Sequence, residues 1–166
     1  MSVFDQRNQK VRTQINVVGN IIEPTECHIC GELKSPNEAY RCKRCRQAIC
    51  ISHRKEKDSP FCPSCAELVD FETKLFSSND DVRFDVAQKL GGVKDPSTIP
   101  AIKKRLGVEA NLTVRYWLAY ALGKIGGEEA REILRELLEH DTHPFVQQGI
   151  QEALQILNQQ SSPNKK

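Results

Sequence analysis

The chain has 166 residues and a formal net charge of +2, and 39% of its residues are hydrophobic. This length fits one ordinary domain or two small ones, and a net charge so close to zero selects no class of partner. The first ten residues are polar and no apolar run approaches the roughly 18 residues of a membrane span, so we expect neither a secretory signal nor a transmembrane helix.

Residues 1–24 form a leader before the first cysteine. Apolar residues alternate weakly in this leader up to Gly19 and Asn20, which predicts one or two short strands that end in a turn. A lone strand is marginally stable in water. The alternatives are therefore pairing with a partner or a second copy of the leader, or disorder.

All seven cysteines lie between Cys27 and Cys65. With one histidine they form the series C-x2-C, C-x2-C, C-x2-H and C-x2-C, separated by eleven, four and eight residues. Zn²⁺ takes four nitrogen or sulfur ligands in a tetrahedron, and a C-x2-C turn places two sulfurs close enough to share one ion. Four such half-sites predict two closed, structural zinc sites, neither of which keeps a position for a catalytic water.

The half-sites can pair in sequence or in an interleaved order. Only four residues separate Cys45 from Cys50, which is short for two consecutive half-sites to fold back on one ion. We therefore favour the interleaved order. It assigns one zinc to Cys27, Cys30, Cys50 and His53, and the other zinc to Cys42, Cys45, Cys62 and Cys65. His28 lies between two ligands, but its C-x2-C pair is already complete.

The cysteine pattern also bears on the compartment and on folding. Cysteines in C-x2-C pairs, odd in number and completed by a histidine, argue against a disulfide framework and for a reducing compartment, so we expect a cytoplasmic protein. The cysteine-rich part has few large apolar residues, so its folding energy must come largely from metal.

At this point residues 25–66 resemble the cross-brace, binuclear treble-clef zinc fingers, the superfamily of FYVE, PHD and RING domains. The resemblance implies a small α+β module with two structural Zn²⁺ ions. The four-residue gap and the C-x2-H pair look most like FYVE domains, which bind phosphoinositides. Both histidines of the FYVE pocket are missing, however: Tyr40 and Arg41 precede Cys42, and Arg46 stands where FYVE domains have glycine.

Two apolar residues look more like a RING domain. Ile29 and Pro63 lie inside the first and last C-x2-C pairs, where RING domains place the residues that contact an E2 enzyme. Ala66 is not the arginine that many RING domains place after the last cysteine. This resemblance implies an alternative function, an E3-type protein that recruits an E2-like or ubiquitin-like protein through the finger and a substrate through the rest of the chain.

A basic cluster surrounds the second C-x2-C pair and consists of Arg41, Lys43, Arg44 and Arg46. Such a cluster can contact the phosphates of a phosphoinositide membrane or of nucleic acid. Seven thiolates and two Zn²⁺ ions together carry three negative charges, however. We therefore favour the interpretation that the cluster offsets thiolate charge; phosphoinositide binding stays a second alternative, and no nucleic-acid partner is expected.

From residue 66 the pattern changes to helix, and from residue 79 the chain repeats with a period of 32, aligning Val82 with Val114 and Leu90 with Leu122. A period between 20 and 50 residues indicates a solenoid. The segments Val82–Gly91 and Val114–Gly123 resemble HEAT-like repeats of the phycobilisome-lyase type. The resemblance implies an all-α solenoid of about three helical pairs over residues 67–158, followed by a disordered tail at 159–166.

Two arginines, Arg83 and Arg115, occupy the arginine position of the repeat motif. We expect them to form an internal ladder with Asp80, Asp81 or backbone carbonyls. The third copy has glutamine at both marker positions, 147 and 155, and a polar terminal repeat is what a solenoid needs as a cap.

Several aromatic residues lie off the apolar stripe: Phe84, Tyr116, Trp117 and Tyr120. Exposed tryptophan and tyrosine are typical anchors of protein interfaces, and the alternative is that these rings pack between repeats. His140 and His143 lie near Pro144, and we interpret them as helix-terminal and loop residues rather than metal ligands.

Catalytic motifs are absent from the sequence, because no glycine-rich phosphate loop follows a strand and every cysteine is assigned to a zinc. The sequence therefore predicts a non-enzymatic, zinc-binding adaptor that mediates protein–protein interaction. Fold alone does not determine this function.

Overall fold

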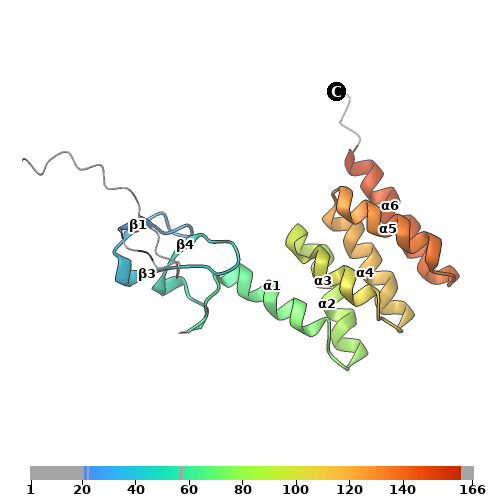
Figure 1. Cartoon of the computed structure of the whole chain (residues 1–166), viewed down its shortest axis with the longest axis horizontal. Helices are drawn as coiled ribbons and strands as arrows, with labels where there is room; N and C mark the ends of the chain where they lie inside the picture. The colour runs from blue at the N-terminus through green and yellow to red at the C-terminus, as the bar shows by residue number, and fades with distance from the viewer. Residues whose placement is uncertain (1–20, 22, 57, 162–166) are drawn as a thin grey trace, which may run out of the picture. The chain divides into compact units, whose positions relative to one another are not determined.

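The computed structural model describes residues 21, 23–56 and 58–161. The predicted leader over residues 1–20 and the last part of the predicted tail, residues 162–166, lie outside the described residues. The chain divides into two compact units, Met1–Glu67 and Leu68–Lys166. Figure 1 shows short strands in the first unit and helices in the second. Among the described residues, no helix combines the length and apolar character needed to cross a bilayer.

The first unit contains two short antiparallel hairpins. Strand β1 (Thr25–Glu26) pairs with β2 (Leu33–Lys34), and β3 (Ala39–Arg41) pairs with β4 (Ala48–Cys50). The 3-10 helix η2 (Pro36–Glu38) precedes β3, and a second one, η3 (Ile51–His53), follows β4. Helix α1 (Pro63–Lys74) begins inside the last cysteine pair.

Each hairpin is closed by a turn with the same hydrogen bonds around a C-x2-C pair. In the first turn the N–H of Gly31 donates to the Cys27 carbonyl, and in the second the N–H of Arg46 donates to the Cys42 carbonyl, at 2.8 and 2.9 Å. The residue after the second cysteine is left-handed in both turns, with φ of 72° at Gly31 and 64° at Arg46. We call these two turns the knuckles.

The buried apolar residues of the first unit are few. Its core cluster contains three cysteines and Ile49, with Tyr40 and Phe61 packed against it. Tyr40 Oη also donates a hydrogen bond to the Phe61 carbonyl at 2.9 Å. A core this small provides little burial free energy, as expected for a metal-stabilised module.

The second unit is built from helices. They are α2 (Asp80–Val93), α3 (Ile99–Leu106), α4 (Leu112–Ile125), α5 (Glu128–His140) and α6 (Pro144–Ser161), with the 3-10 helix η4 (Pro96–Thr98) before α3. Together with α1, the described part of the chain has six α-helices. Helix α6 runs to Ser161, so residues 159–161 are helical and not part of the predicted tail.

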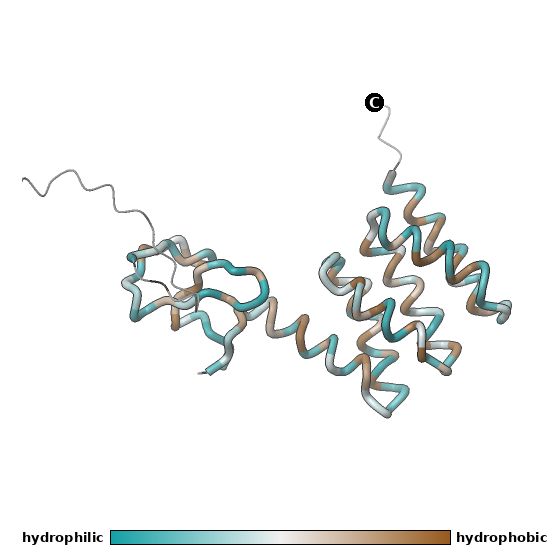
Figure 2. Tube along the Cα trace, in the orientation of Figure 1, coloured by the Kyte–Doolittle hydropathy of each residue, from teal (hydrophilic) through white to brown (hydrophobic). Residues whose placement is uncertain are grey.

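One continuous apolar core fills the second unit. The residues predicted from the 32-residue period, such as Val86, Leu118 and Ile150, are buried in it, and Leu75, the residue after α1, belongs to the same core. Helices α2, α4 and α6 contact one another in series, while α3 packs on α4 and α5, and α5 packs on α4 and α6. Figure 2 shows apolar residues recurring along each of these helices, which is the pattern of a stripe buried against neighbours.

Helix starts in this unit repeat the same cap. The side chain of Asn79 accepts a hydrogen bond from the Asp81 N–H, and Asn111, 32 residues later, accepts from the Thr113 and Val114 N–H groups. Asparagine at this position satisfies donors that the first turn of a helix leaves without partners.

Ion pairs between an arginine and a buried acid also repeat with the 32-residue period. Arg83 Nε donates to Glu109 Oε2 at 2.8 Å, and Arg115 pairs with Asp141. Both arginines bond to an acid 26 residues later. Arg83 also bonds to Asp80 and to the Ser77 carbonyl, as the predicted ladder requires, whereas the N–H of Asp81 is used in the helix cap.

The third copy keeps only the local half of this arrangement. Gln147 stands in place of the arginine and donates from Nε2 to the Asp141 carbonyl at 2.8 Å. This bond reaches six residues back, as does the bond from Arg83 to the Ser77 carbonyl. A neutral glutamine therefore replaces the charged link to a following repeat.

Glycine allows two of the helices to approach closely. A Cβ atom on Gly123 would lie 2.6 Å from Cα of Ala153, whereas one on Gly91, 32 residues earlier, would lie 3.4 Å from Cα of Ala121. The α4–α6 contact therefore has no room for a methyl group at Gly123. In the α2–α4 contact, a methyl group at Gly91 would be in ordinary van der Waals contact with Ala121.

We expect Gly123→Ala to lower the free energy of unfolding of the second unit by about 2 kcal/mol, because backbone must move to admit the methyl group. The matched variant Gly91→Ala should be neutral or stabilising by up to about 1 kcal/mol, because alanine is the better helix former. Urea unfolding followed by Trp117 fluorescence measures both. Equal effects of the two variants would contradict the difference in packing.

Candidate functional sites

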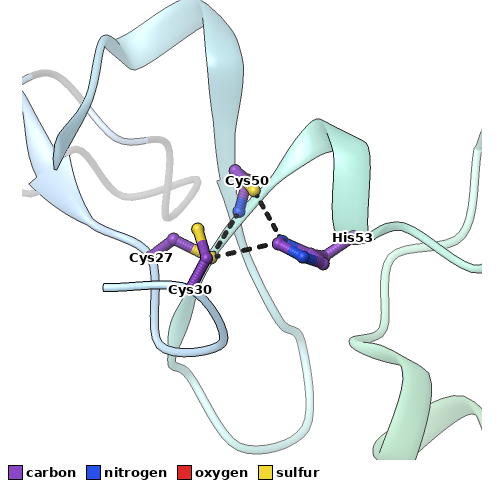
Figure 3. A group of neighbouring side chains, drawn as sticks. All are labelled: Cys27, Cys30, Cys50 and His53. Carbon is purple, nitrogen blue, oxygen red and sulfur yellow. Dashed lines mark hydrogen bonds between the residues drawn. The ribbon is translucent and has the colours of Figure 1, made fainter. Parts of the chain in front are cut away.

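The first candidate metal centre combines the first knuckle, the end of β4 and η3. The ligand atoms of Cys27, Cys30, Cys50 and His53 all lie within 4.8 Å of one another. Figure 3 shows the four side chains directed toward a common point. His53 Nδ1 lies 2.8 Å from Cys50 Sγ and 3.8 Å from Cys27 Sγ. A tetrahedral zinc would separate such sulfur and nitrogen atoms by about 3.5 Å, so the group fits the ion.

The second candidate centre combines the second knuckle with the start of α1. The sulfurs of Cys42, Cys45, Cys62 and Cys65 lie within 4.8 Å of one another, and Cys45 Sγ is 3.9 Å from Cys62 Sγ. Two sulfurs on a tetrahedral zinc are about 3.8 Å apart, whereas a disulfide would bring them to about 2.05 Å. The structure thus brings together the two groups of the interleaved order, and all seven cysteines are free thiols.

Backbone N–H groups point at one buried sulfur in each centre. Cys27 Sγ accepts hydrogen bonds from the N–H groups of Ile29 and Cys50 at 3.4 and 3.3 Å. Cys42 Sγ accepts one from the Cys62 N–H at 3.3 Å. Such outer contacts orient metal ligands and stabilise the thiolate that binds the metal.

These hydrogen bonds lower the pKa of two ligand thiols, those of Cys27 and Cys42. Burial by itself would raise the pKa of the Cys27 thiol, but the backbone N–H donors lower its pKa to about 5. The same competition lowers the pKa of Cys42 to about 6. Burial and the neighbouring thiols raise the pKa of Cys65. Both centres therefore hold at least one thiolate at neutral pH and can take up divalent metal ions.

The residues singled out by the RING resemblance lie at the surface of the first unit. Ile29 is 47% exposed, beside the first candidate centre, and Pro63 is half-buried at the start of α1. His28 is exposed. His140 ends α5 and His143 precedes α6, and neither belongs to a candidate metal group among the described residues.

The basic cluster divides into two parts in the structure. Arg41, Lys43 and Arg46 line one cavity, together with Arg54 from the segment after η3. Arg44 is not among the described lining residues of that cavity. Sequence proximity alone grouped Arg44 with the others and missed Arg54, which the fold brings to the knuckle from eight residues downstream of Arg46.

Aromatic side chains form a row across the second helices of the repeats. Trp117 of α4 contacts three of the other rings, with centroid distances of 6.0 Å to Phe84 of α2, 5.7 Å to Tyr116 and 5.4 Å to Tyr120. Tyr116 stacks on Phe145 of α6 at 4.9 Å. We call this set the aromatic row; its members are Phe84, Tyr116, Trp117, Tyr120 and Phe145.

The sequence supports two interpretations, exposed interface anchors and packing between repeats, and each applies to part of the aromatic row. Phe84 and Trp117 pack against the core of the second unit, so they are partly structural. Phe145 is 43% exposed, and Tyr116 and Tyr120 are half-buried. Tyr116 Oη donates to Glu152 Oε2 at 2.5 Å, and this bond and burial raise its pKa to about 12. The row therefore has a buried side and an accessible side.

Phe145 was missed by the sequence reasoning. Phe84 and Tyr116 follow the valine of their repeats by two positions, but Phe145 precedes Val146 by one. Gly149 leaves room for the Tyr116 ring that stacks on Phe145, because a Cβ atom at position 149 would lie 2.4 Å from that ring.

Comparison with known families matches residues 70–155 to HEAT repeats, which is more than half of the chain. The chain belongs to the HEAT-repeat family. Comparison with curated proteins gives no match. Within the HEAT repeats, the aromatic row lies on α2, α4 and α6, and the match ends before the last six residues of α6. HEAT repeats suggest a protein-interaction scaffold, and the cysteine groups are compatible with two zinc sites.

Proposed function

We propose that this protein is a non-enzymatic adaptor that binds a protein partner through the aromatic row of its HEAT repeats. The observation that carries the proposal is the accessible side of that row, which continues across α2, α4 and α6. Tyrosine and tryptophan supply large contact area at a low cost in side-chain entropy, which is why they are enriched in interface hot spots.

The first unit supports this role as a zinc-stabilised finger. We propose that both cysteine groups hold structural Zn²⁺ and that the unit is a cross-brace treble clef. Its supporting features are the two knuckles, the β3–β4 hairpin and a helix that begins at the last ligand pair. The free thiols fit a reducing compartment, and we propose the cytoplasm.

Recruitment of an E2-like or ubiquitin-like protein is a second candidate function. It is favoured by the exposed Ile29 next to the first metal centre. A charged E2 enzyme mixed with the protein should then discharge its thioester faster, and Ile29→Ala should remove that effect. Unchanged discharge, together with no binding of the E2, would exclude this candidate and leave the adaptor proposal intact.

We expect Tyr120→Ala to leave the repeats folded and to abolish capture of the partner. Tyr120 is half-buried, packs edge to face with Trp117 and has the Lys124 ammonium over its ring, so its loss removes contact area without opening the core. Capture from an extract of the native cell, followed by mass spectrometry, compares the variant with the wild-type protein.

A matched control is Phe76→Ala, which removes an exposed ring outside the aromatic row, 42% accessible in the wild type. This variant should retain the partner. Trp117→Ala should instead lower the free energy of unfolding by about 3 kcal/mol, because its ring packs on the core. Capture that is equal for Tyr120→Ala and wild-type protein would contradict the proposed surface.

A further inference from the structure

One end of the aromatic row combines two rings with a carboxylate. Tyr116 of α4 stacks on Phe145 of α6, with an interplanar angle of 17° between the rings. The Tyr116 hydroxyl also donates to Glu152, which follows Phe145 by about two helical turns and so lies on the same face of α6. We call Tyr116, Phe145 and Glu152 the anionic end of the row. One tyrosine contacts both other members, so rings and carboxylate form a single site.

The Glu152 carboxylate is held by neutral donors. Its Oε2 accepts from Tyr116 Oη at 2.5 Å, and its Oε1 accepts from Gln148 Nε2 at 2.9 Å. These hydrogen bonds lower the pKa of Glu152, so the half-buried side chain is negatively charged at neutral pH. No lysine or arginine in the described part of the chain pairs with it. A carboxylate has about four lone-pair sites, so two donors leave capacity for a further, charged donor.

Other charges along the row add to this anionic character. Asp81 is exposed in the first turn of α2, and Asp85, one turn later, pairs with Lys89 at 2.6 Å. Lys124 of α4 lies over the Tyr120 ring, 5.3 Å from the ring centroid. Together with the carboxylate on α6, the row has three acids and two lysines around it. Its surroundings are therefore net negative, and one of its rings already contacts a cation of the protein itself.

Rings and a carboxylate in one site favour a cationic occupant. Ring faces attract cations, and a guanidinium can also stack flat on a ring while it donates two parallel hydrogen bonds to a carboxylate. An acidic segment would be repelled by Glu152. A purely apolar segment would cover the Glu152 carboxylate without giving it a partner, which costs free energy. Arginine is the side chain that satisfies both the rings and the carboxylate.

We propose that the partner of the aromatic row is a protein with a basic docking segment, and that an arginine of this segment binds at the anionic end. Its guanidinium stacks on the Tyr116–Phe145 pair and donates to Glu152. This inference rests on the proposed adaptor function and adds the chemistry of the partner to it. The neighbouring α4 and α6 hold the site in place before binding, because Tyr116 lies directly on the backbone of Gly149 (Figure 1).

The first test uses a peptide with blocked ends, in which one arginine is flanked by glycines. It is added to the metal-loaded, full-length protein at constant ionic strength, and the backbone amide NMR signals of α4 and α6 are followed. We expect saturable shifts around the anionic end, with a dissociation constant on the order of millimolar. The matched peptide carries citrulline, which has the shape of arginine without its charge, and should bind at least about tenfold more weakly.

The decisive variant is Glu152→Gln, which keeps an acceptor for the Tyr116 hydroxyl and removes the charge. We expect it to bind the arginine peptide about tenfold more weakly and to weaken capture of the partner from the cell extract, with an unchanged urea midpoint for the repeats. Asp81→Asn is the matched control, because it removes an equal charge from α2, outside the anionic end. Its affinity for the peptide should stay within about twofold of wild type.

Four results would overturn the proposal. The first is the absence of saturable shifts with the arginine peptide at about ten times the expected dissociation constant. The second is equal binding of the citrulline peptide, or of a peptide with glutamate in its place. The third is an equal loss of affinity in Asp81→Asn and Glu152→Gln, which would show diffuse attraction to an acidic surface. The fourth is unchanged capture of the partner by Glu152→Gln.

The adaptor proposal has a separate readout. Loss of the partner in Tyr120→Ala, combined with any of these four results, would keep the aromatic row as a binding surface for a partner of different chemistry. Capture that survives Tyr120→Ala would contradict the adaptor proposal itself, whether or not the arginine peptide binds. The two failures are therefore distinguishable.

Discussion

Removal of metal by a strong chelator should unfold the first unit and leave the HEAT repeats folded. The first unit has a core cluster of four buried residues, three of them cysteines, so it retains little apolar burial once the metal is gone. Structural zinc in small modules provides roughly 10–16 kcal/mol of folding free energy. The repeats have their own continuous core and no candidate metal group among the described residues.

The measurement follows each unit by its own signal. Helical circular dichroism and the fluorescence of Trp117, the single tryptophan of the chain, report on the repeats. Amide NMR signals of residues 25–66 report on the first unit and should collapse to the narrow range of unfolded chain. Metal analysis before chelation should give two zinc ions per molecule, in line with the two cysteine groups.

Two variants sharpen the test, one that removes a metal ligand and one that removes a neighbouring side chain. Cys65→Ser should lose one of the two metal ions, because it removes a sulfur from the second centre, while the neighbouring Ser64→Ala should keep both. Fewer than two metal ions in the wild-type protein, or a first unit that stays folded after chelation, would contradict the assignment of structural metal centres.

Replacement of Glu109 by glutamine should destabilise the HEAT repeats by about 3 kcal/mol at neutral pH. The Glu109 carboxylate is buried and accepts hydrogen bonds from Arg83 Nε at 2.8 Å, Arg105 Nε at 2.7 Å and the Asn111 N–H at 2.9 Å. The substitution leaves the buried Arg83 guanidinium without its full countercharge, and a buried charge that loses its partner typically costs about 3–5 kcal/mol.

The effect should depend on pH in a defined direction. Burial by itself would raise the pKa of the Glu109 carboxyl, but the hydrogen bonds from Arg83 and Arg105 lower its pKa to about 2. A carboxyl whose pKa is lowered by folding stabilises the protein fully above its unfolded value of about 4.3, and this contribution is lost as the pH falls toward the folded value. The stability difference between wild type and Glu109→Gln should therefore narrow between about pH 4.5 and 2.

Urea unfolding followed by Trp117 fluorescence measures this difference at each pH and is insensitive to the first unit. Asp85→Asn is the control, because it removes an exposed ion pair with Lys89 on α2, at 2.6 Å. Its cost should stay within about 0.5 kcal/mol. A similar cost for both variants at neutral pH, or a difference for Glu109→Gln that does not change with acid, would contradict the role assigned to the buried carboxylate.

The spacing of the cysteine pairs and the 32-residue repeat made much of the molecule predictable from sequence. The metal groups follow from C-x2-C turns and from the short interval between Cys45 and Cys50, which favours the interleaved order over pairing in sequence. The helices follow from the recurrence of apolar residues every 32 positions, because each repeat must bury the same stripe.

Contacts between segments were harder to predict. Arg83 pairs with Glu109, and Arg115 pairs with Asp141. The acidic side chain is therefore longer in one repeat than in the next, and it lies in a loop or at a helix end. Arg54 reaches the cavity that Arg41 and Arg46 line only because the chain folds back after η3. Glu109 and Asp141 are 32 residues apart and so follow the period of the repeat, but nothing else in the sequence marks them as the partners of the arginines, and the place of Arg54 depends on the tertiary fold.

The recurrence of the arginine–acid link and of the close glycine contact has a consequence for the architecture. A tandem copy of residues 109–140 inserted after His140 would place the copied glutamate where Arg115 now meets Asp141, and the copied arginine would meet Asp141 in turn. Gly123 would then face a copied Ala121 instead of Ala153. Whole 32-residue repeats can thus be added with the same ion pair and the same glycine–alanine contact between neighbouring repeats. Gln147 would still stand in the last repeat, where no further acid follows.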